Sequence, residues 1–232
     1  MKTHLLLLPG LLCDDALWFE QVQALSGHCD CTIADLTKDD SVASMATRAI
    51  AGMPDRFAVA GLSMGGYVAM EIMRQVPTRV ERLALLDTAP GADTAERMDS
   101  RRELIKRVEQ GEFAAVIEGH FLKFVHPDRL EDEVLMAKIR TSANHVGPEA
   151  YIRQQTAIIN RPDSTSTLGK VSCPTLVLCG ADDALTPPLL HEQMAAAIPG
   201  AELVKIKDSG HLPTLEKPEA VNAALGHWLG LS

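Results

Sequence analysis

The sequence has no excess of basic residues. Its 232 residues include 22 Lys and Arg against 31 Asp and Glu, a formal net charge of −9. Proteins that bind nucleic acids usually present a basic patch, so this balance argues against a nucleic-acid partner. The remaining composition, 46% hydrophobic and 23% charged, is ordinary for a globular protein with a substantial core.

Long apolar segments are also missing. No run approaches the roughly 18 residues that a membrane-spanning helix needs, so insertion into a membrane is not expected. The apolar start of the chain is four leucines, residues 5–8, and Pro9-Gly10 ends it. This run is too short for a signal peptide and favours a buried strand.

The cysteines lack a layout that indicates pairing. Five is an odd number, and a reducing, cytoplasmic setting is the default expectation. Cys29 and Cys31 have one residue between them, whereas zinc sites favour wider spacing and a second ligand pair. Residues 29, 31 and 33 would share one face of a strand, so we expect packing rather than a metal site.

Short apolar runs alternate with helical stretches along both ends of the chain. The runs that predict strands are 4–8, 29–34, 57–62, 80–86, 174–180 and 202–207. The stretches that predict helices include 16–25, a segment from about 41 to 53, the residues after the third strand as far as Pro77, and 218–229. This alternation predicts an α/β fold with right-handed crossovers and a mostly parallel, doubly wound sheet.

The rhythm changes in the middle of the chain. Residues 90–169 contain no convincing strand, and their apolar positions have helical spacing. We therefore expect a core made of residues 1–89 and 170–232, with residues 90–169 inserted as a helical lid over the carboxyl ends of the strands. Phe121, Phe124 and Tyr151 are candidates for lining a pocket beneath it.

The stretch around Ser63 carries the strongest chemical pattern. Gly61-Leu62-Ser63-Met64-Gly65 lies between a predicted strand and a predicted helix. A sharp turn there would expose the Ser63 hydroxyl and aim the first helix amides at the same point, and larger side chains at positions 61 and 65 would collide with the turn. An exposed hydroxyl beside free N–H donors is the beginning of an acyl-transfer site.

A serine hydroxyl needs a base, and the base benefits from an acid that orients it. Of eight histidines, His211 alone follows the last predicted strand in a loop, on the same rim as Ser63. Three aspartates lie on that rim: Asp87 at the end of one predicted strand, and Asp182 and Asp183 after another. Position alone leaves the choice among them open, because aspartates are common in turns.

Four stretches resemble landmarks of the α/β-hydrolase family, in that family's order Ser, acid, His. They are Leu8-Pro9-Gly10-Leu11, Gly61-Leu62-Ser63-Met64-Gly65-Gly66, Gly180-Ala181-Asp182-Asp183-Ala184-Leu185-Thr186-Pro187 and Ser209-Gly210-His211. The resemblance covers nearly the whole chain. It implies Asp183 as the acid, with Asp182 and Asp87 as second choices, and the backbone amides of Met64 and Leu11 as an oxyanion hole. Pro9-Gly10 replaces the family's usual His-Gly.

The resemblance implies a serine hydrolase that cleaves a small or medium carboxylic ester through an acyl-enzyme, without cofactor or metal. Serine in the turn disfavours the dehalogenase and epoxide-hydrolase branches, and Gly-Leu-Ser-Met-Gly-Gly is similar to small esterases and enol-lactone hydrolases. Lactonase, thioesterase and carbon–carbon bond hydrolase remain alternatives on the same triad. A ligand receptor that has kept the hydrolase fold is an alternative of a different class. The expected partner is a small acyl substrate, and the sequence does not indicate an oligomeric state.

Overall fold

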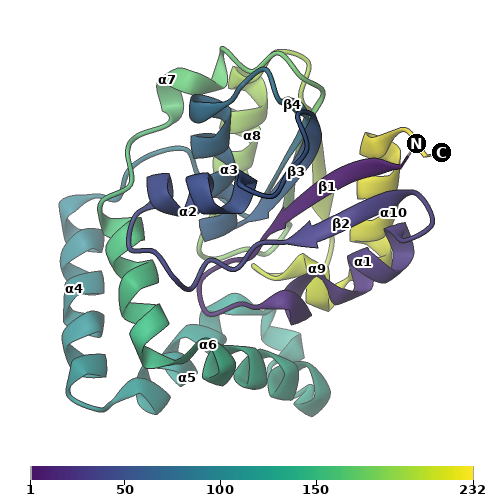
Figure 1. Cartoon of the computed structure of the whole chain (residues 1–232). Coiled ribbons are helices and arrows are strands. Elements are labelled where there is room, and N and C mark those ends of the chain that lie inside the picture. The colour runs from purple at the N-terminus through teal and green to yellow at the C-terminus, as the bar shows by residue number, and fades with distance from the viewer. Residues whose placement is uncertain (1, 232) are drawn as a thin grey trace.

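Six parallel strands form one sheet in the order β2-β1-β3-β4-β5-β6. The computed structural model describes residues 2–231 (Figure 1). The strand bounds are β1 Thr3–Leu8, β2 Cys29–Ile33, β3 Phe57–Leu62, β4 Val80–Leu86, β5 Thr175–Gly180 and β6 Glu202–Ile206. Each strand predicted from the sequence is present, within one residue at either end, and the doubly wound parallel sheet is confirmed.

Helices cover both faces of this sheet. Figure 1 shows α2, α3 and α8 on one side of the strands and α1 and α10 on the other. The bounds on the first side are α2 Val42–Ile50, α3 Met64–Gln75 and α8 Pro188–Ala197. Those on the second side are the 3₁₀ turn η1 Asp15–Trp18, α1 Phe19–Leu25, the short α9 Pro213–Glu216 and α10 Pro218–Leu229.

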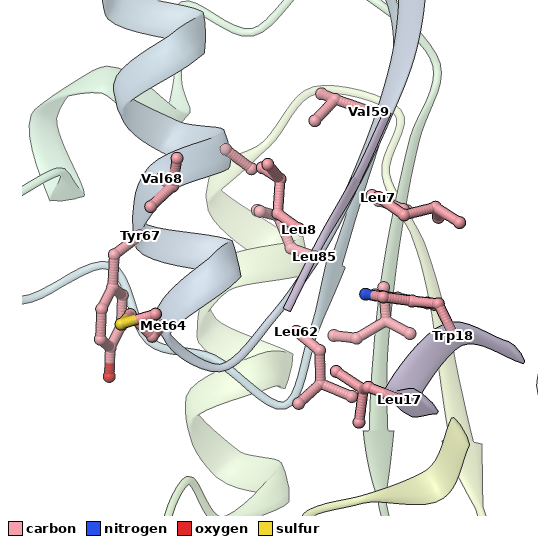
Figure 2. Packing of buried hydrophobic residues seen from close by; sticks show 14 of the residues in the cluster. Leu7, Leu8, Leu17, Trp18, Val59, Leu62, Met64, Tyr67, Val68 and Leu85 are labelled. Atoms are coloured by element: carbon pink, nitrogen blue, oxygen red, sulfur yellow. The ribbon is translucent and has the colours of Figure 1, made fainter. Parts of the chain in front are cut away.

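The central strands are buried on both faces, which explains their continuous apolar sequence. All of β3 is buried, and the four leucines of β1 have no exposed surface. In Figure 2, Met64, Tyr67 and Val68 of α3 lie on one side of the strands, and Leu17 and Trp18 lie on the other. Burying each large apolar side chain contributes about 1.5–3 kcal/mol, so these layers hold the strand ends in place.

Two predicted helices are shorter than their sequence patterns indicated. The segment predicted as a helix from residue 16 begins as the 3₁₀ turn η1, where the Asp14 carboxylate accepts a hydrogen bond from the amide of Ala16. The helix predicted to reach Met53 ends at Ile50, after beginning at a cap formed by Ser41. Both differences are at helix ends, where capping and tight turns compete with the α-helical pattern.

Strand β2 places the cysteine pair on its core-facing side. Cys29 is buried and Cys31 and Ile33 are partly buried, while Asp30 and Thr32 between them are exposed. The face shared by residues 29, 31 and 33 therefore covers the core, as predicted.

Residues between β4 and β5 are entirely helical or irregular, as expected. Their elements are α4 Ala95–Glu109, α5 Phe113–Phe124, the 3₁₀ turn η2 Pro127–Arg129, α6 Glu133–Ile159 and α7 Thr165–Leu168. Helix α6 is bent where Gly147 has a φ of 77° before Pro148. The division of the chain into a core and a separate lid stays a prediction. Within residues 2–231, no helix is both long and apolar enough to cross a membrane.

Leu7 provides a test of how much the buried strands contribute to the stability of the fold. Its side chain is 0% exposed, whereas Leu189 on α8 is 61% exposed. We expect Leu7→Ala to lower the free energy of unfolding in urea by about 2–5 kcal/mol, because it leaves a cavity in the core. The matched substitution Leu189→Ala should change the same quantity by no more than about 0.5 kcal/mol. Equal losses in the two variants would contradict this account of the core.

Candidate active site

Ser63 lies at the turn between β3 and α3 with a backbone conformation that residues other than glycine rarely adopt. Its φ and ψ are 56° and −114°. The neighbouring strand fixes this turn, because the Ser63 amide donates to the carbonyl of Leu86 at 2.9 Å. The hydroxyl of Thr88 donates to the Ser63 carbonyl at 2.9 Å. Contacts on both peptide groups therefore hold the strained residue in position.

The glycines around Ser63 are required by close backbone contacts. A Cβ atom at Gly61 would overlap the carbonyl of Gly65, and one at Gly65 would overlap the carbonyl of Leu8. This agrees with the collision expected from the sequence. A Cβ atom at Gly66 would in addition overlap the side chain of Thr88, a contact that spacing alone did not indicate.

His211 lies between Ser63 and Asp183. Its Nε2 atom is 2.8 Å from the Ser63 hydroxyl oxygen, and its Nδ1 atom is 2.8 Å from Oδ2 of Asp183. The histidine is 3% exposed, and its hydrogen bond to Asp183 is buried. The backbone amide of His211 donates to the carbonyl of Phe124 at the end of α5, at 3.0 Å. The helical segment thus helps to hold the loop that carries His211.

Asp183 is held as a charged carboxylate. Its Oδ1 atom accepts from the amides of Leu185 and Thr186, and its Oδ2 atom accepts from the Thr186 hydroxyl at 2.6 Å. Burial acts to raise the pKa of Asp183, but the attraction to His211 and the hydrogen bonds from His211 and Thr186 outweigh it and leave the pKa well below its usual range. A permanent negative charge beside Nδ1 favours the tautomer of His211 that leaves Nε2 free to accept a proton.

The two other candidate aspartates have different surroundings. The side chain of Asp182 is 48% exposed and lies 3.6 Å from Nε2 of His126. Asp87 is fully buried, and its Oδ1 atom accepts from the amide of Gly180 at 2.8 Å, while Oδ2 has no partner among the described residues. Burial, followed by the charge of Asp183, raises the pKa of Asp87 well above its usual value. Of the three, Asp183 is the one whose carboxylate hydrogen-bonds to His211.

Asp87, Asp183 and His211 have potential ligand atoms within 4.8 Å of one another, a grouping that also occurs in metal sites. Both Asp183 oxygens already accept hydrogen bonds from its own loop, and His211 Nδ1 contacts the same carboxylate. Asp183 and His211 are therefore already engaged as a hydrogen-bonded pair, which does not fit a cation between these two residues.

Two backbone amides remain free near the Ser63 hydroxyl. In residues 2–231, neither the Met64 amide nor the Leu11 amide has a hydrogen-bond acceptor. Met64 begins helix α3, whose dipole adds positive potential at this end. Leu11 lines the same cavity as Ser63. These are the amides that the family resemblance implied as oxyanion donors.

The structure adds two bracing residues that the sequence patterns missed. Glu216, 3% exposed, accepts from the amides of His126, Gly210 and Leu212, and so fixes the turn before and after His211. Gln154 of α6 accepts from the Leu12 amide at 3.1 Å and holds the loop that carries Leu11. Gln154 acts across 142 residues of sequence, and Glu216 joins its own turn to His126, 90 residues away, so neither contact follows from a short motif.

A cavity of about 490 Å³ opens at Ser63 and His211. Its walls come from the sheet rim and from helices α4, α5 and α6. Phe124 lines it, as one of the three aromatic candidates. Phe121 and Tyr151 do not line it, but the Tyr151 hydroxyl lies 2.9 Å from Nε2 of His120, which does.

Comparison with known proteins identifies the family to which this chain belongs. The profile of the Alpha/beta hydrolase family matches residues 5–224, and the chain belongs to that family. The fold is similar to a thermophilic esterase from Thermogutta terrifontis, with a TM-score of 0.92 and 30% identity, covering 99% of this chain and 90% of that one.

Two curated relatives show how far the likeness extends. A pimeloyl-[acyl-carrier protein] methyl ester esterase from Nitrosomonas europaea is 28% identical over 230 residues, covering 93% of this chain and 91% of the relative. The Mycobacterium tuberculosis protein BpoC is also 28% identical, over 177 residues that cover 72% of this chain. The chain spans 65% of the length of that relative, less than two thirds.

Asp87 gives the site a testable pH dependence. Its raised pKa means that, as the pH increases above about 4, the unfolded chain releases this proton while the folded protein keeps it. The wild type therefore loses stability from this group as the pH rises. We expect Asp87→Asn to be more stable relative to the wild type at pH 7 than at pH 4, in urea unfolding at both values. A gain in stability of Asp87→Asn over the wild type that is equal at both pH values, or larger at pH 4, would contradict the burial of a protonated Asp87.

Proposed function

We propose that this protein is a serine hydrolase that cleaves small or medium carboxylic esters through an acyl-enzyme. The observation that carries the proposal is the continuous chain of hydrogen bonds from Ser63 through His211 to Asp183, each 2.8 Å long. The site opens into a cavity and lies beside two free backbone amides. In this proposal Ser63 is the nucleophile, His211 the general base and Asp183 the acid that orients it.

The first half of the reaction forms the acyl-enzyme. His211 Nε2 accepts the hydroxyl proton of Ser63 as the oxygen attacks the ester carbonyl. The carbonyl oxygen becomes an oxyanion, to which the amides of Met64 and Leu11 donate; each such donor contributes about 3–4 kcal/mol in comparable sites. The proton on His211 then passes to the departing alcohol. Asp183 stabilises the positive charge that His211 carries between these two transfers.

The second half releases the acid. Water enters where the alcohol left, and His211 removes its proton as the water oxygen attacks the acyl carbon. The same two amides receive the second oxyanion. His211 then returns the proton to the Ser63 oxygen as the acyl bond breaks, which restores the starting enzyme. No step needs a metal or a cofactor.

Esters are favoured over other acyl substrates by the relatives. The Thermogutta terrifontis structure is an esterase at 30% identity, and the Nitrosomonas europaea relative is named a methyl ester esterase. Lactones and thioesters also have a carbonyl carbon that Ser63 could attack, so the test must include them. A receptor that retains its ligand would give one slow turnover instead of steady product release.

We infer that the helices between residues 90 and 169 act as a lid that selects the acyl group. Three observations support this role: α4, α5 and α6 contribute walls to the cavity, the Phe124 carbonyl holds the His211 amide, and Gln154 holds the Leu12 amide. The lid would therefore influence both the shape of the cavity and the position of the catalytic loops.

Substitution of the proposed triad tests the roles directly. With p-nitrophenyl butyrate, Ser63→Ala should lower kcat/KM by about 10⁵-fold and Asp183→Asn by about 10⁴-fold. Asp182→Asn is the matched control and should keep kcat/KM within about twofold, because its half-exposed carboxylate does not contact His211. Turnover by Ser63→Ala within a few-fold of the wild type would overturn the nucleophile. Loss in Asp182→Asn with retention in Asp183→Asn would overturn the acid.

A substrate panel tests the reaction class. Aryl esters, lactones and thioesters of matched acyl length should all reach the site, with the highest kcat/KM for esters. A fluorophosphonate probe should label the wild type and not Ser63→Ala. A single turnover with retained ligand across the whole panel would favour a receptor and contradict the proposed enzyme.

A further inference from the structure

The cavity at Ser63 has a charge opposite to that of the protein as a whole. The chain carries a net charge of −9. Nevertheless, the charged side chains that line the cavity are Arg97, Arg101 and Lys123, and among the described residues no Asp or Glu lines it. A cavity walled by charges of one sign concentrates the electric field and attracts ligands of the other sign.

Arg101 is fixed in place by a buried network. Its Nε atom donates to Asp93 at 2.6 Å and its Nη1 atom donates to Gln155 at 2.8 Å. Asp93 also accepts from Arg161, and the side chains of Asp93 and Arg161 are 1% and 4% exposed. One carboxylate is thus shared by two guanidinium groups, which leaves a net charge of +1. In residues 2–231, Nη2 of Arg101 has no partner.

The other two cations are not neutralised. In the part of the chain that the structure describes, neither the side chain of Arg97 nor that of Lys123 forms an ion pair or a hydrogen bond. His120, which also lines the cavity, responds to this field. Burial, followed by the charges of Arg101 and Lys123, lowers the pKa of His120 to about 4, so its imidazole is neutral at pH 7.

Neither of the carboxylates next to the site, Asp183 and Asp93, lines the cavity. Asp183 lies behind His211, and its carboxylate contacts Nδ1 of His211 and accepts hydrogen bonds from Leu185 and Thr186 of its own loop. Asp93 lies beneath Arg101 and Arg161. The cavity at Ser63 is therefore lined by three cations. Among the described residues, Arg101 has a carboxylate partner, Asp93, which it shares with Arg161, and Arg97 and Lys123 have none.

We propose that the natural substrate is an anion: an ester whose acyl part carries a negatively charged group, such as a carboxylate, bound by Arg97, Arg101 and Lys123. This inference rests on the proposed hydrolase function. The acyl part remains in the cavity through both halves of the reaction, whereas the alcohol leaves after the first. Cations in the cavity wall would thus hold the acyl chain while its carbonyl carbon is attacked twice.

The test compares two esters that differ only in this charge. Mono-p-nitrophenyl glutarate has a carboxylate where p-nitrophenyl pentanoate has its terminal methyl group. We expect the wild type to have a kcat/KM about tenfold higher for the glutarate ester, and this preference to fall as salt is added. The double variant Arg97→Gln/Lys123→Met should reduce the preference about tenfold, since each exposed ion pair contributes up to about fivefold.

A matched double variant controls for a general loss of positive charge. Arg102 and Lys106 are exposed on the same helix α4 but do not line the cavity. Arg102→Gln/Lys106→Met should keep the wild-type preference. Two results would overturn the anionic substrate: no preference of the wild type for the glutarate ester, or equal preferences in the two double variants. If both esters are still hydrolysed, the proposed hydrolase function is unaffected by either result.

A binding measurement separates this inference from the reaction itself. Monomethyl glutarate should bind to Ser63→Ala protein in isothermal titration calorimetry, with a Kd about tenfold weaker when Arg97→Gln/Lys123→Met is added. If no ester is turned over, the proposed function fails, but this titration still decides the anion site. No binding to Ser63→Ala, or a Kd that the added substitutions leave unchanged, would contradict it.

Discussion

The site depends on a backbone reversal that is tight enough to require contact between main chains. Gly61 and Gly65 approach backbone carbonyls so closely that neither can carry a Cβ atom, and Ser63 between them has a positive φ. The buried sheet and helix α3 oppose relaxation of this turn. Packing energy in the core is thus used to hold one hydroxyl at the rim in a conformation that an isolated peptide would rarely adopt.

The remaining groups reach Ser63 because parallel strands end on one edge of the sheet. Asp183 follows β5 and His211 follows β6, so the strand order itself brings them together. The final adjustment comes from more distant contacts. Glu216 fixes the turn around His211, and the carbonyl of Phe124 accepts from its amide. Because Phe124 ends α5, a movement of α5 would directly shift His211, the proposed base.

The strands, the parallel sheet and the proximity of Ser63 and His211 could be predicted from the sequence, because each depends on the local spacing of apolar residues and turns. Spacing could not separate Asp183 from Asp182, because both follow β5, and the distinction depends on which carboxylate reaches His211. The network of Asp93, Arg101 and Arg161 could not be found either, since its partners are far apart in sequence and meet only through helix packing.

The central claim is that acyl transfer passes through the Ser63 oxygen, and trapping that intermediate tests it most directly. Wild-type protein mixed with p-nitrophenyl butyrate and quenched with acid within milliseconds can be digested and analysed by mass spectrometry. The account predicts one butyryl group per chain, attached at Ser63, that appears with the initial release of p-nitrophenol and disappears on further incubation. Steady turnover with the label on another residue would contradict it.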